Sequence, residues 1–190
     1  MSETSDDRDR EDAFRSLFER VYPDLVRFVQ RRADPDRAED LAAEVFLVVW
    51  RRFDDVPAAG DARPWIFGIA RNLLLNERRG DQRRHALGVR LADALATSSV
   101  LEPAEQVTRR VDVARAWQRL SETHQEALAL AVFDDLNAPE AAAVLGISPV
   151  AFRLRVSRAR RALRLHLGDP PRHPRNTSAT QARAIAERTP

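Results

Sequence analysis

Residues 136–167 read LNAPEAAAVLGISPVAFRLRVSRARRALRLHL, which predicts two helices separated by a tight turn. Asn137 and Glu140 form a capping-box pattern at the start of the first helix. Gly146 is placed to end this helix, and Ser148 is placed to cap the second. Two helices joined by a turn of about three residues are typical of a helix-turn-helix.

The second of these helices has one apolar face and one basic face at the helical period of about 3.6 residues. The apolar face, which we expect to be buried, consists of Phe152, Val156, Ala159, Leu163 and Leu167. The opposite face carries Val150, Arg153, Leu154, Ser157, Arg158 and Arg161. Arginine can bind guanine edges or phosphates, and leucine can contact a thymine methyl group. This face is therefore predicted to bind the major groove of DNA; a merely solvated basic face is the alternative.

Composition limits the class of protein. The 190 residues are 44% apolar, enough for one ordinary core or two small ones, and we expect two. There is no cysteine, and the four histidines show no ligand spacing, so we expect no metal and no cofactor. No apolar run is long enough to span a bilayer, and the acidic N-terminus is unlike a secretory signal. We therefore expect a soluble cytoplasmic protein without membrane insertion.

The pattern of helices and breaks predicts an all-α chain of two small domains joined by a flexible linker. Residues 1–11 are acidic and predicted to be disordered, and residues 168–190 are predicted to be a disordered tail. The first domain covers residues 12–84, with helices at about 12–32, 34–53 and 63–84. The linker covers residues 85–106, and the second domain covers residues 107–167, with two helices before the helix-turn-helix.

The second helix of the first domain has an acidic stripe opposite its apolar face. The stripe consists of Asp36, Asp40, Glu44 and the apolar Leu47. Like charges four residues apart slightly destabilise a helix, which favours a use for them, such as binding a basic protein partner. The alternative is a solvated surface on which Arg37 and Arg51 balance the acids.

The third helix combines aromatic, amide and basic side chains. The residues expected to pack inward are Trp65, Ile66, Ile69, Leu73 and Leu74, and those expected to face outward are Arg71, Asn72, Asn76, Arg78 and Arg79. Amides and arginines can bind bases and phosphates, and aromatic rings near the preceding loop could stack on an unstacked base. Packing in the core is the alternative role for these aromatic residues.

Three blocks of the sequence together resemble a bacterial RNA polymerase sigma factor of the extracytoplasmic-function group, the small form that contains only conserved regions 2 and 4. The blocks are DRAEDLAAEVFLVVWRRF (36–53), RPWIFGIARNLLLNERR (63–79) and LSETHQEALALAVFDDLNAPEAAAVLGISPVAFRLRVSRARRAL (120–163). The resemblance covers roughly residues 12–167. Family members commonly have Thr, Val, Lys and Ser where this chain has Ala151–Leu154, so family habit does not indicate the preferred promoter.

The resemblance implies a role for each surface. Core RNA polymerase would be bound by the acidic stripe of Asp36, Asp40, Glu44 and Leu47. The minus-ten element of promoter DNA would be bound by Arg63, Trp65, Asn72, Asn76, Arg78 and Arg79, with the loop from Val56 to Arg63. The minus-thirty-five element would be bound by Val150, Arg153, Leu154, Ser157, Arg158 and Arg161. An anti-sigma protein is a further expected partner, and no catalytic residue is implied.

Three other classes of protein remain as alternatives. A helix-turn-helix regulator would bind its operator without polymerase. An adaptor would use the arginines for protein contacts only. A helical enzyme is disfavoured, because the sequence shows no clustered nucleophile and base, no phosphate-binding loop and no metal constellation.

Overall fold

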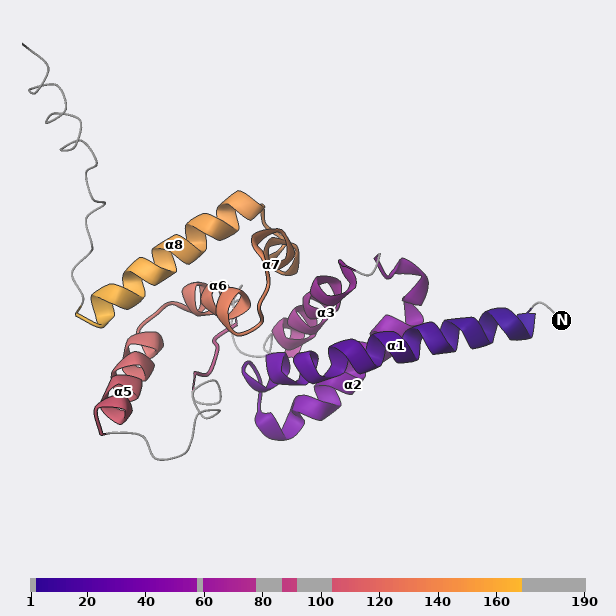
Figure 1. Cartoon of the computed structure of the whole chain (residues 1–190), viewed down its shortest axis with the longest axis horizontal. Helices are drawn as coiled ribbons and strands as arrows, with labels where there is room; N and C mark the ends of the chain where they lie inside the picture. Colours follow the sequence, from indigo (N-terminus) through magenta and orange to yellow (C-terminus); the bar gives the residue numbers. More distant parts are fainter. Residues whose placement is uncertain (1–2, 58–59, 78–86, 92–103, 169–190) are drawn as a thin grey trace, which may run out of the picture.

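The computed structural model describes residues 3–57, 60–77, 87–91 and 104–168, and within these ranges it contains helices and no strand (Figure 1). The helices are α1 (Glu3–Gln30), η1 (Pro35–Arg37), α2 (Ala38–Arg51), η2 (Phe53–Asp55), α3 (Ala62–Glu77), α5 (Ala104–Gln118), α6 (Glu122–Val132), α7 (Ala138–Leu145) and α8 (Pro149–His166). The predicted all-α fold class is confirmed.

The first group of helices, α1 to α3, packs around a shared apolar core. Leu25 and Phe28 of α1 and Ile66 and Phe67 of α3 are fully buried in it. The rings of Phe28 and Phe67 lie 4.7 Å apart between centroids. Phe67 had not been assigned to the core from the sequence, whereas Trp65 and Ile69, which had been, are only half-buried.

The N-terminal helix is longer than predicted. It begins at Glu3 rather than near Asp12, so the described part of the segment expected to be disordered is helical. Arg10 anchors this part to the end of α2, because its Nη2 donates to the Trp50 carbonyl oxygen at 3.3 Å and its Nη1 lies 3.5 Å from Oδ1 of Asp54. Acidic residues at a helix N-terminus are also favourable. The composition of the segment alone could not reveal an anchor 40 residues away.

The caps of α2 and the bounds of α3 follow local rules. Asp34 accepts from the backbone N–H of Asp36 at 3.2 Å, and Pro35 opens η1, so the predicted cap forms a 3-10 turn before α2 begins. Arg63 and Pro64 lie in the first turn of α3, as expected, and Glu77 is its last described residue. The rest of the predicted helix, 78–84, lies outside the described residues.

Residues 87–91 of the predicted linker are packed rather than free, and its last three residues, 104–106, already belong to α5 (Ala104–Gln118). Leu87, Val89 and Leu91 are buried. The Gln125 side chain accepts from the Val89 N–H at 3.1 Å, and Nε1 of Trp117 donates to the Val89 carbonyl at 2.7 Å. The alternation of apolar residues from 87 to 91 signals an extended buried segment, which the linker interpretation overlooked.

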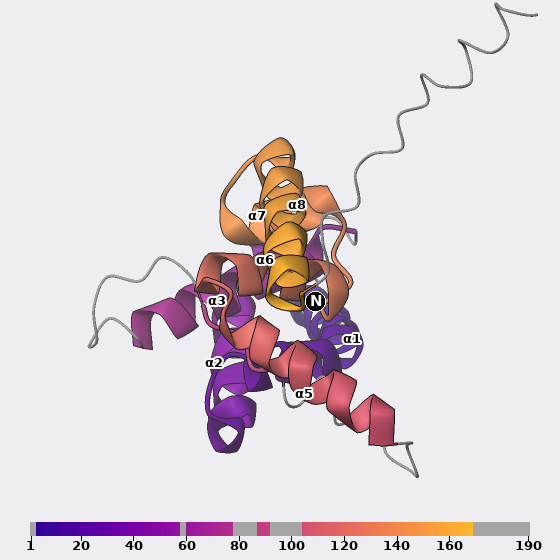
Figure 2. The same ribbon diagram turned by 90° about the vertical axis from the view of Figure 1, so that its left-hand side faces the viewer.

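The two groups of helices lie side by side, as Figures 1 and 2 show. In the second group α8 packs against α5, α6 and α7, and α7 also packs along α3 of the first group. The apolar core is continuous from α1 through residues 87–91 to α8. The helix-turn-helix is therefore in direct contact with the first domain.

Candidate nucleic-acid and protein interfaces

The helix-turn-helix has the caps that the sequence predicted. The Asn137 side chain accepts from the Glu140 N–H at 3.1 Å, and the Glu140 carboxylate accepts from the Asn137 N–H at 2.8 Å. Gly146 adopts a left-handed conformation with φ of +65°, and the N–H groups of Gly146 and Ile147 donate to the carbonyls of Ala143 and Ala142. Ser148 accepts from the Ala151 N–H at 3.2 Å and starts α8.

The outward face of α8 is open and basic. All six residues predicted to bind DNA there are exposed: Val150, Arg153, Leu154, Ser157, Arg158 and Arg161. The two apolar members, Val150 and Leu154, are 61% and 52% exposed. Among the described residues, no ion pair involves an arginine of α8. The charge of this helix is therefore available to an external anion.

The inward face of α8 holds the helix in place. Phe152, Val156 and Ala159 are buried, as predicted. Leu163 is only half-buried and Leu167 is 40% exposed. The predicted apolar face is therefore buried at its first three residues and increasingly exposed toward the end of the helix.

The acidic stripe of α2 is a second open surface. Asp36, Asp40 and Glu44 are all exposed, and Leu47 beside them is 57% exposed. Within the described part of the chain these three carboxylates form no ion pair, and Arg37 instead lies 3.0 Å from Oε1 of Glu77. Arg37 therefore pairs with Glu77, and among the described residues no ion pair joins Arg37 or Arg51 to the stripe; the role of the stripe stays a prediction.

The third predicted surface, on α3, is only partly open. Asn72 and Asn76 are exposed, and Trp65 is half-buried beneath the Arg52 guanidinium, 5.5 Å from its ring centroid. Arg63 is engaged elsewhere, because its Nε lies 3.0 Å from Oδ2 of Asp24 and its Nη2 donates to the Asp134 carbonyl. Arg78 and Arg79 lie outside the described residues.

A groove of about 370 Å³ runs along this part of α3. One wall carries Trp65 and Asn72, and the other carries Pro139, Glu140 and Ala143 of α7. The predicted nucleic-acid surface of α3 therefore has the first helix of the helix-turn-helix as its neighbour.

The sequence interpretation missed a set of buried charges between the two groups of helices. Asp134, in the turn between α6 and α7, pairs with Arg31 and Arg32, and Glu126 of α6 pairs with Arg71 of α3. Arg71 had been expected to face outward. A carboxylate among apolar residues, as in the stretch QEALALAV around Glu126, is the one local signal that a buried partner exists.

Arg32 is the most deeply placed of these arginines. Its Nη1 donates to the Phe28 carbonyl at 2.9 Å, and its guanidinium lies 3.6 Å from the centroid of the Phe28 ring. Burial lowers the pKa of Arg32 from its ordinary value, and the charge and hydrogen bond of Asp134 oppose that shift.

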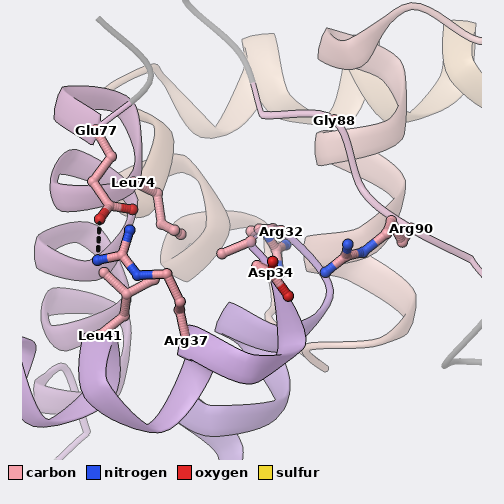
Figure 3. Close-up of a pocket in the computed structure, with 9 residues that line it drawn as sticks. Arg32, Asp34, Arg37, Leu41, Leu74, Glu77, Gly88 and Arg90 are labelled. Atoms are coloured by element: carbon pink, nitrogen blue, oxygen red, sulfur yellow. Dashed lines mark ion pairs between the residues drawn. The ribbon is translucent and has the colours of Figure 1, made fainter. Parts of the chain in front are cut away.

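A further pocket, of about 380 Å³, lies beside Arg32 (Figure 3). Arg37 and Glu77 pair across one side of it, and Nη2 of Arg90 donates to the Gln30 carbonyl at 3.0 Å. The arginines that line the pocket are thus already engaged within the chain, and we assign it no ligand.

The comparisons with known proteins agree with this layout. Residues 17–84 match the family model described as Sigma-70 region 2, and residues 110–163 match that described as Sigma-70, region 4. The RNA polymerase sigma factor NccH of Alcaligenes xylosoxydans xylosoxydans is 34% identical over 157 residues, 80% of this chain and 84% of NccH. The ECF RNA polymerase sigma factor SigL of Mycobacterium tuberculosis is 28% identical over 155 residues, 80% of this chain and 88% of SigL. The chain belongs to the extracytoplasmic-function group of the sigma-70 family.

Solved structures of sigma factors share the fold. RpoE in complex with the anti-sigma factor NepR, from Bartonella quintana, superposes with a TM-score of 0.59 at 24% identity, covering 84% of this chain and 99% of that one. CnrH in complex with the cytosolic domain of CnrY gives a TM-score of 0.58 at 23% identity, covering 85% and 91%. In this sigma factor, the α2 stripe and α3 lie in region 2 and most of α8 lies in region 4.

Two further observations concern other kinds of site. Within the described ranges, no group of histidine and acidic side chains could hold a metal ion. No helix in the same ranges combines the length and the apolar character needed to cross a membrane.

Proposed function

We propose that this chain binds core RNA polymerase and directs it to start transcription at specific promoters. The observation that carries the proposal is the order of regions 2 and 4, together with the exposed acidic stripe of α2 and the exposed basic face of α8. The relatives named above are RNA polymerase sigma factors. The chain supplies binding contacts, and the bond-forming chemistry belongs to the polymerase; the complex acts in the cytoplasm.

The acidic stripe is the proposed polymerase contact. Its carboxylates have no competing ion pair within the described residues, so a basic partner surface can take them without first breaking an internal contact. Leu47 adds an exposed apolar side chain at the end of the stripe, which contributes area that a partner can bury.

The minus-ten element is the proposed ligand of α3. The exposed amides of Asn72 and Asn76 can hydrogen-bond to base edges, and Trp65 offers a ring at the start of the same helix. Binding unstacked bases here would hold the duplex open, because each unstacked step costs a few kcal/mol that the contacts must repay. Arg78 and Arg79 are proposed to bind neighbouring phosphates, and Arg63 would join them only after it leaves Asp24 and the Asp134 carbonyl.

The minus-thirty-five element is the proposed ligand of α8. Arg153 and Arg158 are exposed and can bind guanine edges or phosphates, and the exposed Leu154 can contact a thymine methyl group. Each DNA contact is weak alone, and binding becomes strong when polymerase fixes the spacing between the two regions.

Reconstitution with core polymerase tests the proposal. Purified chain and core enzyme are incubated with a library of promoter fragments, and the transcription starts are mapped. We expect specific starts only when both proteins are present. A regulator of the helix-turn-helix class would instead bind one duplex tightly without polymerase, and that result would refute the proposal.

A matched pair of variants links the result to α8. The double variant Arg153→Ala, Arg158→Ala should reduce initiation at the selected promoters by about tenfold or more, because each arginine contact to DNA contributes about 1–3 kcal/mol. The double variant Arg15→Ala, Arg20→Ala removes the same charge from exposed positions on α1 and should leave initiation unchanged. If α8 served only as an adaptor surface, promoter choice would survive the first pair.

A further inference from the structure

The outward face of α8 carries two large apolar side chains in its first two turns. Val150 is 61% exposed and Leu154 is 52% exposed. The two residues are four positions apart, so they lie on the same side of the helix, about 6 Å from each other along its axis. Exposed apolar groups add little to the stability of the free chain and become favourable when a partner covers them. The pair therefore needs a partner with an apolar group of its own.

The position of this pair in the helix-turn-helix is the one that reads bases. In such motifs the N-terminal residues of the second helix contact base edges in the major groove. Ser148 caps α8 through the Ala151 N–H, so Val150 lies in the first turn and Leu154 in the second. The helix lies at the outer edge of its group of helices (Figure 1). Valine in a helix has one strongly preferred rotamer, so it loses little freedom on binding.

The composition of α8 limits which bases it can read directly. Residues 148–168 contain no Asp, Glu, Asn or Gln. Adenine is read chiefly by Asn and Gln, and the cytosine amino group by Asp and Glu, so this helix lacks the usual partners of both bases. It presents arginine for guanine, apolar side chains for the thymine methyl group, and Ser157 for any base. The helix is therefore suited to guanine and thymine.

The arginines of α8 divide into two sets around the apolar pair. Arg153, Arg160 and Arg164 follow one another at helical spacing and line one pocket of about 460 Å³ on the side of α8 that faces α6. Arg158 instead lies four positions after Leu154, on the outward side. None of the ion pairs among the described residues uses any of these arginines. A row of cations along one flank suits the phosphates that border a groove, whereas a cation beside Leu154 suits a base.

We propose that Val150 and Leu154 bind the methyl groups of two thymines in the minus-thirty-five element, while Arg153, Arg160 and Arg164 bind phosphates at the border of the same groove. This inference rests on the proposed function of α8. A separation of about 6 Å spans about two base-pair steps of about 3.4 Å, so the two thymines lie no more than two base pairs apart. Each methyl group and the side chain that covers it leave water together, which favours binding.

Deoxyuridine tests the methyl contacts, because it differs from thymidine only by the missing methyl group. The complex of the chain with core polymerase is titrated with a double-stranded promoter fragment taken from the mapped transcription starts. Each thymine of the minus-thirty-five element, on either strand, is replaced in turn. The Kd should rise about fourfold at two thymines, the effect of about one buried carbon. Deoxyuridine between the two promoter elements is the control and should leave the Kd unchanged.

Protein variants assign each methyl group to its side chain. Leu154→Ala should abolish the deoxyuridine effect at one thymine, and Val150→Ala should abolish it at the other, because the covering side chain is gone. Leu165→Ala is the matched control: Leu165 is 55% exposed on the same side of α8, eleven positions beyond Leu154, and both effects should persist. Alanine favours the helix at these exposed positions, and circular dichroism verifies that each variant is folded.

Salt dependence tests the flank of arginines. Arg160→Ala with Arg164→Ala should reduce the slope of log K against log salt concentration by about two, one for each lost phosphate contact, and leave both deoxyuridine effects in place. Arg15→Ala with Arg20→Ala, at exposed positions on α1, should leave the slope unchanged. A changed base preference in the first pair, without a change of slope, would overturn the assignment of this flank to phosphates.

The outcomes separate this inference from the proposed function. Two thymines within two base pairs, each coupled to one of the two side chains, support it. Deoxyuridine without effect at every thymine of the element overturns it, and so do effects that persist undiminished in Val150→Ala and Leu154→Ala. In those cases specific initiation with core polymerase still stands. If the proposed function fails, no specific start is found with the unaltered chain, and the inference fails with it.

Discussion

At the scale of single residues, the helix-turn-helix depends on one backbone conformation. Gly146 has φ of +65° and closes α7 with two hydrogen bonds from the turn. A side chain is disfavoured in this conformation by about 1–2 kcal/mol. No neighbouring atom lies within 4 Å of the position that a Cβ atom would occupy, so the constraint comes from the backbone conformation and not from a clash. The turn from α7 to α8 therefore favours glycine at this position.

Gly146→Ala is accordingly expected to lower the free energy of unfolding by about 1–2 kcal/mol, measured by urea titration with circular dichroism. Gly68→Ala is the control of opposite sign. Gly68 lies inside α3 with nothing within 4 Å of its Cβ position, so alanine there should stabilise by about 0.5–1 kcal/mol. Equal effects at the two glycines would contradict the conformational explanation.

Arg32 illustrates a charge that another cation cannot replace. It reaches Asp134 and the Phe28 carbonyl with different nitrogens while its guanidinium stacks on the Phe28 ring. Lysine offers a single ammonium group, so Arg32→Lys should destabilise the chain by about 1.5–3 kcal/mol. Arg37→Lys changes an exposed surface pair with Glu77 and should cost less than about 0.5 kcal/mol. Thermal unfolding compares the two, and similar losses would contradict this account.

At the scale of helices, one face of α2 stabilises the fold and the opposite face is proposed to bind a partner. Its apolar face is buried through Leu41, Val45 and Val49, while Asp40 and Glu44 repel each other on the exposed side. If the acidic side of α2 serves a partner and not the fold, removing one of its charges should raise the stability of the chain and weaken binding of the partner.

Glu44→Gln should therefore stabilise the free chain slightly, by about 0.2–0.5 kcal/mol, because it relieves the repulsion from Asp40. The same variant should weaken binding to core polymerase by about three- to tenfold, measured by fluorescence anisotropy. Glu19→Gln, on the exposed side of α1, removes an equal charge and should leave the affinity unchanged. Unaltered polymerase affinity in Glu44→Gln would show that the stripe is only solvated.

The first turns of α1 depend on a contact with another helix. Arg10 is held by the Trp50 carbonyl and Asp54, with its guanidinium 5.2 Å from the Trp50 ring centroid. Arg10→Ala should increase hydrogen exchange in residues 7–14 by severalfold, because isolated helix ends fray. Arg15→Ala removes only a local pair with Asp12 and should change exchange little. Equal exchange in both variants would mean that α1 holds its first turns without Arg10.

At the scale of the whole molecule, the two proposed DNA contacts belong to different groups of helices, and polymerase holds both on one promoter. Val150→Ala with Leu154→Ala should weaken binding of the polymerase complex to a complete promoter fragment by about tenfold, the effect of two lost methyl contacts. Binding to a fragment with only the minus-ten element should not change. Fluorescence anisotropy measures both, and Leu165→Ala should match the unaltered chain. Equal losses on the two fragments would contradict this division of contacts.

Whether the sequence could predict an interaction depends on how far apart the two residues lie along the chain. The caps at Asn137 and Ser148, the turn at Gly146 and the exposed face of α8 depend on residues within a few positions, and these predictions are confirmed. The pairing of Asp134 with Arg31 and Arg32 spans more than 100 positions, so no local pattern encodes it. The contact of Arg10 with the Trp50 carbonyl spans 40 positions and has no local pattern either. Sequence patterns thus predicted the helices and the exposed surfaces, and they missed the contact between the regions.

The exposed apolar pair at the start of α8 has a consequence for modified DNA. Cytosine methylated at C5 presents its methyl group at the same edge of the major groove as thymine does. If Val150 and Leu154 read only that group, a cytosine in place of either thymine would regain part of the lost affinity once it is methylated. A DNA methyltransferase would then change which promoters this sigma factor uses, with the order of the bases and the sigma factor itself both unaltered.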